Sequence, residues 1–100
     1  MADHIDNIVI NTSIEKGLYK KSDGKAELAK LMEEHGELAR AILKEDYPEI
    51  MDAIGDMAVV LCNLAFFYKL SFTGCYEQSA KIYAGRKGKM IKGAFVKEAK

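Results

Sequence analysis

The chain has 100 residues, a length typical of one domain, so a single domain spanning residues 1–100 is expected. Its 15 basic side chains balance its 15 acidic ones, which argues against a protein that coats nucleic acid through bulk charge. Because a chain of this size can bury only a limited core, a homodimer or homotetramer is expected.

Cysteine usage and the N-terminus indicate a cytoplasmic protein. Cys62 and Cys75 form neither a metal-ligand spacing nor a disulfide framework, so reduced thiols are expected. Residues 1–4 show neither the basic start nor the apolar stretch of a signal peptide. The longest apolar run, residues 57–68, is too short to cross a bilayer, so no membrane partner is expected.

Helical spacing of the apolar residues predicts helices at residues 4–18, 25–44, 48–70 and 75–84. Ser22 or Asp23 is suited to cap the second helix, since either side chain can accept from the free amides at a helix start. Asp46 is suited to cap the third helix, and Pro48 fits its first turn. The fold class is therefore all-α, a compact four-helix bundle with short connections.

The apolar stripes predict which faces of the second and third helices are buried. In the second helix the stripe consists of Leu28, Leu31, His35, Leu38 and Ile42. In the third helix it consists of Ile50, Ile54, Met57, Val60, Leu61 and Leu64. His35 is interpreted as a core or interface residue rather than a metal ligand, because its neighbours on the stripe are apolar.

The helical pattern is interrupted towards the C-terminus. Residues 71–74 are expected to form a turn. Residues 90–96 form either a short hairpin that turns at Lys92–Gly93 or an extended tail. The bundle is thus expected to end in a short extended or hairpin segment.

Six acids on the second and third helices carry the main functional signal: Glu33, Glu34, Glu37, Glu49, Asp52 and Asp56. Many lie three or four residues apart, where like charges on a helix repel. A divalent cation with oxygen ligands would relieve this repulsion, and Mg²⁺ is the usual ion where a substrate carries phosphates. Antiparallel packing of the two helices would gather four to six carboxylates around one pocket.

Each of these acids has a simpler interpretation as part of a solvated helix face, and Glu33 fits that interpretation well. Asp56 fits it least, because it lies between Ile54 and Met57 in the apolar stretch, where an unpaired buried carboxylate would be costly. The basic run at residues 86–89, next to Gly85, is suited to phosphate binding or forms a solvated tail.

These residues match a known family pattern. Glu33-Glu34-x-x-Glu37, followed by an acidic helix that contains Asp56 and Asn63, resembles the MazG-like all-α nucleoside triphosphate pyrophosphohydrolases. The ending at residues 86–98 resembles that of the short MazG-like proteins of phages and bacteria. The resemblance covers residues 5–98.

The resemblance implies Mg²⁺-dependent hydrolysis of an NTP or dNTP between the α- and β-phosphates, with Mn²⁺ as the alternative ion. It implies that Glu34, Glu37 and Asp56 bind the metal, and that Glu33 or Glu34 positions or deprotonates the attacking water. Members of this family commonly form dimers or dimers of dimers. Candidate phosphate or sugar contacts are Lys30, Asn63, Arg86, Lys89 and Lys97.

One position departs from the family pattern. A glutamate usually lies three residues before the aspartate of the second motif, where this chain has Ala53. Either Glu49 and Asp52 supply the metal-binding pair one turn earlier, with Asp56 as an added ligand, or Asp52 replaces the glutamate beside Asp56. Joint use of Asp52 and Asp56 is the favoured interpretation.

Three functions are therefore compared. The leading hypothesis is a house-cleaning pyrophosphohydrolase that removes unwanted nucleotides. The second is a non-catalytic protein of the same fold that senses nucleotides or metal, and Ala53 keeps this hypothesis open. The third is a helical protein that binds a partner or nucleic acid through its basic C-terminal stretch, which the neutral overall charge disfavours.

Overall fold

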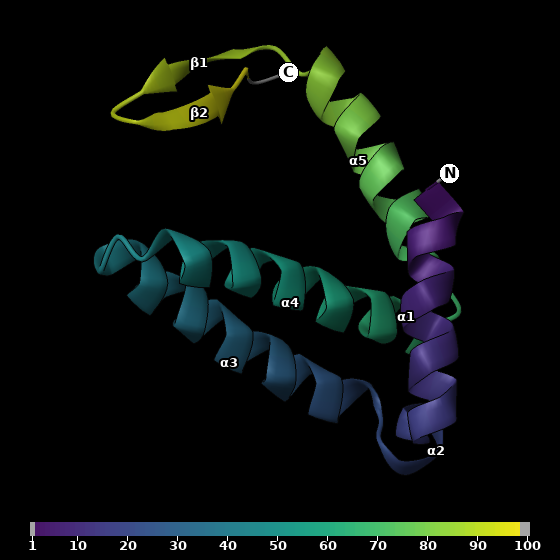
Figure 1. Cartoon of the computed structure of the whole chain (residues 1–100). Helices are drawn as coiled ribbons and strands as arrows, with labels where there is room; N and C mark the ends of the chain where they lie inside the picture. Colours follow the sequence, from purple (N-terminus) through teal and green to yellow (C-terminus); the bar gives the residue numbers. More distant parts are fainter. Residues whose placement is uncertain (1, 99–100) are drawn as a thin grey trace.

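The computed structural model of the chain describes residues 2–98. Within this range it is helical apart from a C-terminal two-stranded hairpin (Figure 1). The elements are α1 (Ala2–Lys16), α2 (Leu18–Lys21), α3 (Gly24–Leu43), α4 (Tyr47–Phe67), α5 (Phe72–Gly85), β1 (Gly88–Ile91) and β2 (Ala94–Lys97). The helical fold class is confirmed.

The first predicted helix is divided in two by Gly17. This residue has φ +77°, a left-handed backbone conformation that glycine adopts without steric cost. The four-residue helix α2 follows it and leads into α3. The predicted helix at residues 4–18 is therefore α1 plus the first residue of α2.

Local capping sets the starts of α3 and α4 as expected. The Asp23 carboxylate accepts a hydrogen bond from the Ala26 amide at 2.8 Å. The Asp46 carboxylate accepts one from the Glu49 amide at 3.2 Å, and Pro48 lies in the first turn of α4. The two helices run antiparallel side by side and form the main helix pair of the fold (Figure 1).

The seam between α3 and α4 consists of residues spaced alternately by three and four. Its buried members are Glu27, Glu34 and Ala41 on α3 and Ala53 and Val60 on α4. Leu31 and Leu38 lie on the same line of α3 and are half-buried. This spacing directs a line of side chains to one side of each helix.

The predicted stripe on α3 is only partly correct, because Leu28, His35 and Ile42 are exposed. They follow the seam residues by one position, which rotates them about 100° around the helix axis. Ile54 on α4 is exposed for the same reason. Because the two helices are antiparallel, side chains one position after a seam residue point to the same side of the pair on both helices. These residues therefore share one surface of the pair.

We call this surface the apolar face. It consists of Leu28, Met32 and Ile42 on α3 and Met51, Ile54 and Leu61 on α4. Met32 is 68 % exposed and Met51 is 71 % exposed. By length and composition alone, α4 is also apolar enough to cross a membrane, and only 22 % of its most apolar 18-residue window is buried.

The start of α5 is held by a residue from the other end of the chain. The buried Asp6 carboxylate on α1 accepts hydrogen bonds from the Thr73 amide and the Thr73 hydroxyl, both at 3.0 Å, and from the Ser71 hydroxyl at 3.3 Å. The Ser71 hydroxyl also accepts from the Gly74 amide at 3.0 Å. The predicted turn at residues 71–74 is thus wrong, since α5 begins at Phe72.

From this junction α5 leads away from α4 and ends in the hairpin. Lys92 and Gly93 both have positive φ, 49° and 85°, as a tight hairpin turn requires. The hairpin alternative is therefore confirmed over the extended tail. Every described residue of both strands is exposed, and the Phe95 ring meets Tyr83 of α5 edge-on.

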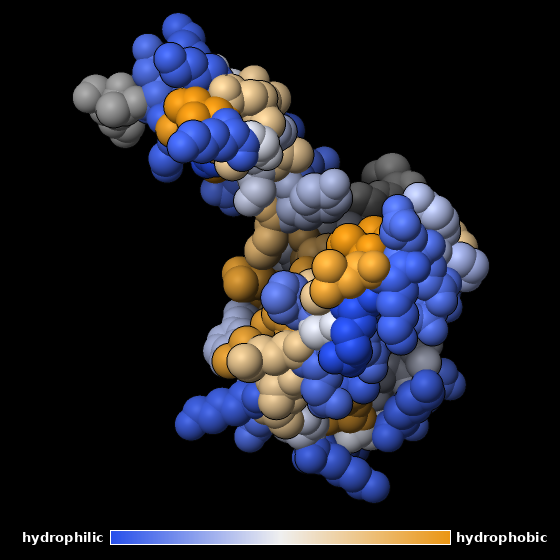
Figure 2. Space-filling model, turned by 90° about the vertical axis from the view of Figure 1, so that its left-hand side faces the viewer, coloured by the Kyte–Doolittle hydropathy of each residue, from blue (hydrophilic) through white to orange (hydrophobic). Residues whose placement is uncertain are grey.

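The single chain is much more open than a compact domain. Its accessible surface is 8086 Å², whereas a compact monomer of 11.1 kDa exposes about 5,700 Å². Its radius of gyration is 16.0 Å, compared with about 13 Å for a compact domain of this length. Apolar side chains line the hollow between the helical body and the projecting hairpin end (Figure 2). The expected compactness is therefore not found in one copy.

Candidate functional site

The surface opposite the apolar face carries most of the charged residues predicted to act. On both helices, the side chains one position before a seam residue point to this second side of the pair. We call it the polar face. It consists of Lys30, Glu33, Glu37, Arg40 and Lys44 on α3 and Glu49, Asp52, Asp56 and Asn63 on α4.

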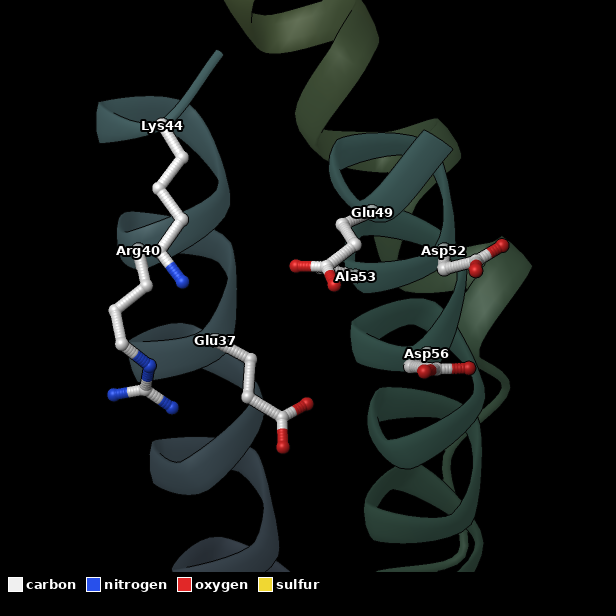
Figure 3. Close-up of a pocket in the computed structure, with 7 residues that line it drawn as sticks. All are labelled: Glu37, Arg40, Lys44, Glu49, Asp52, Ala53 and Asp56. Atoms are coloured by element: carbon white, nitrogen blue, oxygen red, sulfur yellow. The ribbon is translucent and has the colours of Figure 1, made fainter. Parts of the chain in front are cut away.

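A pocket of about 410 Å³ opens on the polar face near the α3–α4 turn. Its lining residues are Glu37, Arg40, Lys44, Glu49, Asp52, Ala53 and Asp56 (Figure 3). Four of the six predicted acids are therefore brought to one pocket from two helices. The antiparallel pairing of α3 and α4 achieves this, because residues far apart in the sequence face each other across the seam.

The carboxylates do not converge on one point. Glu37 and Glu49 extend towards the gap between the helices, whereas the carboxylates of Asp52 and Asp56 are turned away from α3 (Figure 3). Among residues 2–98, no three His, Cys, Asp or Glu side chains are close enough together to hold a metal ion. Asp56 is exposed rather than buried, because it lies one position before the seam residue Met57.

Glu34 differs from the other acids in its burial. It lies on the seam itself and is 5 % exposed. Its Oε1 is 3.5 Å from the Lys30 ammonium, and this hydrogen-bonded pair raises the pKa of Lys30. Its Oε2 is buried and has no hydrogen-bond partner in the part of the chain that the structure describes, which is an uncommon and costly state for a carboxylate oxygen. Glu33, the adjacent candidate, is exposed on the polar face.

Arg40 and Lys44 line the pocket although the sequence analysis did not single them out. Both are exposed, and neither forms an ion pair within the described part of the chain. Their signal was present in the spacing: residues 33, 37, 40 and 44 follow steps of four, three and four, so they share one helix face.

Further along the polar face, α1 covers a second cavity of about 380 Å³. Lys30 and Asn63, both predicted substrate contacts, line it together with residues of α1. The Asn63 side-chain oxygen is buried and accepts from the Ser13 hydroxyl at 2.8 Å and the Tyr19 hydroxyl at 2.7 Å. Burial raises the pKa of Tyr19, and the nearby Ser13 hydroxyl opposes this shift.

Glu27 also lines this cavity and was missed by the sequence analysis. It is buried on the seam, and its burial raises its pKa, with the nearby Lys30 acting in the opposite direction. Only the fold reveals this residue, because its burial depends on α1 lying over the end of the helix pair.

The basic residues predicted at the C-terminus lie elsewhere. Arg86 caps the end of α5, while Lys89 and Lys97 lie on β1 and β2. All three are exposed, and none lines either cavity of the polar face in the same chain.

Comparison with known protein families matches residues 23–90 to the MazG nucleotide pyrophosphohydrolase domain. The match runs from the cap of α3 into β1 and includes both faces of the α3–α4 pair. The chain belongs to the MazG family. No curated protein and no solved structure gives a significant match.

Proteins of the MazG family typically use divalent metals. The residues present fit such an ion chemically, because the pocket offers four carboxylates and carboxylate oxygens are the ligands that hard cations prefer. Glu34 Oε2 adds a buried acceptor that has no hydrogen-bond partner among the described residues. Ala53, which stands where MazG-like proteins usually have glutamate, lines the floor of the pocket and is buried.

Proposed function

We propose that this MazG-family protein hydrolyses nucleoside triphosphates between the α- and β-phosphates, releasing a nucleoside monophosphate and pyrophosphate. Membership of a nucleotide pyrophosphohydrolase family supports the reaction class. The observation that carries the proposal is the pocket, in which Glu37, Glu49, Asp52 and Asp56 from two helices line one cavity. Removal of unwanted NTPs or dNTPs from the nucleotide pool is the biological role that we propose.

Mg²⁺, with Mn²⁺ as the alternative, is the proposed cation. Glu37, Asp52 and Asp56 would hold it, with Glu49 and Glu34 as further ligands. Asp52 and Asp56 are exposed, so rotation about their side-chain bonds can redirect both carboxylates into the pocket. When bound, the ion would neutralise phosphate charge and increase the acidity of water at the site.

Glu34 or Glu33 is the proposed acceptor for the proton of the attacking water. Glu34 Oε2 is available for this role because no group within residues 2–98 forms a hydrogen bond with it. Water adds to the α-phosphorus, the bond from this phosphorus to the oxygen bridging to the β-phosphate breaks, and pyrophosphate leaves. The proton goes to the glutamate. As the general base, this glutamate must lie within hydrogen-bonding reach of the water.

The nucleoside end of the substrate is assigned to the cavity under α1. Lys30 and Asn63 line it, each seven residues, or about two helical turns, from Glu37 and Asp56 respectively. The Ser13 hydroxyl also lines this cavity and donates to the Asn63 side-chain oxygen, so a sugar or base there would meet the polar groups of Ser13, Lys30 and Asn63. Arg86, Lys89 and Lys97 remain candidate phosphate contacts only if a second copy supplies them.

A non-catalytic nucleotide-binding or metal-binding protein is the second candidate. It is favoured by Ala53 and by the carboxylates of Asp52 and Asp56, which are turned away from α3 (Figure 3). Such a protein would be thermally stabilised by Mg²⁺ and nucleotide without turnover.

We further infer that the protein is a homodimer or homotetramer assembled through the apolar face. The single chain exposes roughly 2,400 Å² more than a compact monomer, whereas a standard interface buries about 800 Å² on each partner. Insertion of α4 into a bilayer is the alternative way in which the apolar face could be buried. It is disfavoured because Glu49, Asp52 and Asp56 lie on the same helix and would be costly there.

The reaction is tested with a panel of NTPs and dNTPs in the presence of Mg²⁺, scored for pyrophosphate as well as for inorganic phosphate. Pyrophosphate release is expected from at least one nucleotide. Asp56→Asn and Glu37→Gln are each expected to lower it by about 100-fold or more, since a ligand carboxylate is lost. Glu77→Gln on α5 is the matched control and should retain activity.

Two outcomes would count against this proposal. Release of inorganic phosphate alone would indicate ordinary phosphatase chemistry. Full activity in folded Asp56→Asn and Glu37→Gln proteins would show that the pocket is not the active site.

A further inference from the structure

The charged residues of the pocket form successive layers along the antiparallel helix pair. Glu37 of α3 lies at the level of Asp56 of α4 (Figure 3). Towards the α3–α4 turn, Arg40 is attached to α3 near the level of Asp52, and Lys44 is attached beyond the level of Glu49 (Figure 3). The helix rise places Arg40 about 4.5 Å and Lys44 about 10.5 Å beyond Glu37 along the axis of α3.

The layers differ in the charge that they present. By their points of attachment, Glu37 and Asp56 form a layer that is acidic on both helices, and the residues beyond it are cations on α3 and acids on α4. The Arg40 side chain extends back, however, so its guanidinium lies beside Glu37 (Figure 3). The carboxylates are suited to divalent cations, and the fixed positive charge lies only on the α3 side of the pocket. The Lys44 ammonium lies nearer the α3–α4 turn than the Arg40 guanidinium (Figure 3), so the positive charge extends from beside the proposed metal ligand Glu37 towards the turn.

Arg40 is not used to stabilise the helix end. Cations in the last turn often interact with the terminal carbonyl groups of a helix. The Arg40 side chain instead extends back along α3 towards Glu37 (Figure 3), with Nη1 lying 3.5 Å from the point that a Cβ on Gly36 would occupy. It forms no ion pair within the described residues, so its guanidinium is free to bind an anion.

The chemistry of these cations fits consecutive phosphate groups. The planar guanidinium of Arg can donate two parallel hydrogen bonds to one phosphate, while the Lys ammonium acts as a compact point charge. Two such groups one helical turn apart can contact neighbouring phosphates of one chain. Since they lie in the same pocket as the acids without pairing to them, a polyphosphate with bound Mg²⁺ would complement both charges.

We propose that Arg40 and Lys44 bind the β- and γ-phosphates of the substrate, so that its phosphate chain runs towards the α3–α4 turn and its nucleoside lies under α1. This assignment rests on the proposed function and adds the direction in which the substrate lies. It also gives the leaving pyrophosphate a positively charged site, which stabilises the charge that develops as the α–β bond breaks.

The assignment is tested first by binding. Inorganic tripolyphosphate with Mg²⁺ is titrated into the protein by calorimetry, and wild type is compared with Arg40→Gln, Lys44→Gln and the double variant. Each single variant is expected to weaken binding by about 10-fold or more, the effect of losing one charge-assisted hydrogen bond. Lys81→Gln on α5 is the control, and thermal unfolding confirms that every variant is folded.

Arg86→Gln tests the rival explanation, in which the basic C-terminal segment binds the phosphates. If binding survives in the Arg40 and Lys44 variants and is lost in Arg86→Gln, the C-terminal segment of another copy binds the phosphates and the assignment is wrong. If tripolyphosphate binds equally well to all variants, the assignment is also wrong.

Turnover separates this assignment from the hydrolase proposal. Unchanged kcat/KM for pyrophosphate release in the double variant, together with normal wild-type activity, would refute the Arg40 and Lys44 assignment and leave the hydrolase intact. Conversely, tripolyphosphate binding that depends on Arg40 and Lys44, in a wild-type protein that turns over no nucleotide, would support the binding site and refute the hydrolase. Product inhibition by pyrophosphate should weaken in the double variant if both proposals hold.

Discussion

Asp6 joins the first helix to the start of the fifth, and its replacement tests how this junction is held. One carboxylate oxygen accepts three hydrogen bonds, from the Thr73 amide, the Thr73 hydroxyl and the Ser71 hydroxyl. Asp6 is 5 % exposed, so water cannot easily replace these bonds. In Asp6→Ala the acceptor is lost for all three donors.

The magnitude follows from the kinds of donor involved. A hydrogen bond to a charged group contributes about 1.5–3 kcal/mol, and loss of a helix cap costs about 1 kcal/mol. The hydroxyls of Ser71 and Thr73 lie 3.2 Å apart and can bond to each other, which offsets part of the loss. We therefore expect Asp6→Ala to lower the free energy of unfolding by about 2–4 kcal/mol. Asp6→Asn retains one acceptor and should cost less.

Urea unfolding followed by circular dichroism measures the change at one fixed protein concentration, because an oligomer couples stability to concentration. Asp23→Ala is the matched control, since Asp23 caps α3 within one turn and is exposed, with an expected cost of about 1 kcal/mol. Amide exchange in the first turn of α5 should also accelerate in Asp6→Ala. An Asp6→Ala protein no less stable than Asp23→Ala would refute this reasoning.

Three further predictions follow from burial and exposure. Burial raises the pKa of Glu27 above its ordinary value of 4.5, so the folded state favours the neutral carboxyl group. The contribution of Glu27 to the free energy of unfolding is therefore fully present below pH 4.5 and is lost as the pH rises through the pKa of Glu27 in the folded protein. Glu27→Gln should thus stabilise the protein at pH 7 and have little effect at pH 4 in urea unfolding, and equal effects at both pH values would contradict this. Burial raises the pKa of Cys62 to about 11, while Cys75 is exposed, so iodoacetamide at pH 8 should label Cys75 and spare Cys62 by mass spectrometry. Met51→Glu on the apolar face should shift the oligomer towards monomer by light scattering, whereas Glu33→Gln on the polar face should not; an unchanged mass in both would place the interface elsewhere.

The sequence predicted those parts of the fold that depend on neighbouring residues. The starts of α3 and α4 were predicted because Asp23 and Asp46 cap amides three residues away. The start of α5 was misplaced although Ser71 caps it locally, accepting from the Gly74 amide three residues later. The additional bonds from Asp6, more than 60 residues earlier, depend on the tertiary fold. The division of the α3 stripe into a seam and an exposed face was also missed, because seven-residue spacing is compatible with either face until the partner helix is known.

The candidate site shows the same limit. Helical spacing predicted that acids of two helices would meet, and Glu37, Glu49, Asp52 and Asp56 line one pocket. Spacing did not predict the direction of each carboxylate, since that depends on side-chain rotation. The burial of Glu34 and the position of Asn63 under α1 required the tertiary arrangement of three helices.

The two faces of the α3–α4 pair use separate sets of residues on the same helices, about 200° apart around each axis. A substitution at Arg40 or Asp52 therefore alters one surface without changing any side chain on the other. If the polar face binds substrate and the apolar face binds a second copy, as proposed, substrate preference can diverge among descendants of this chain while their quaternary contacts stay constant.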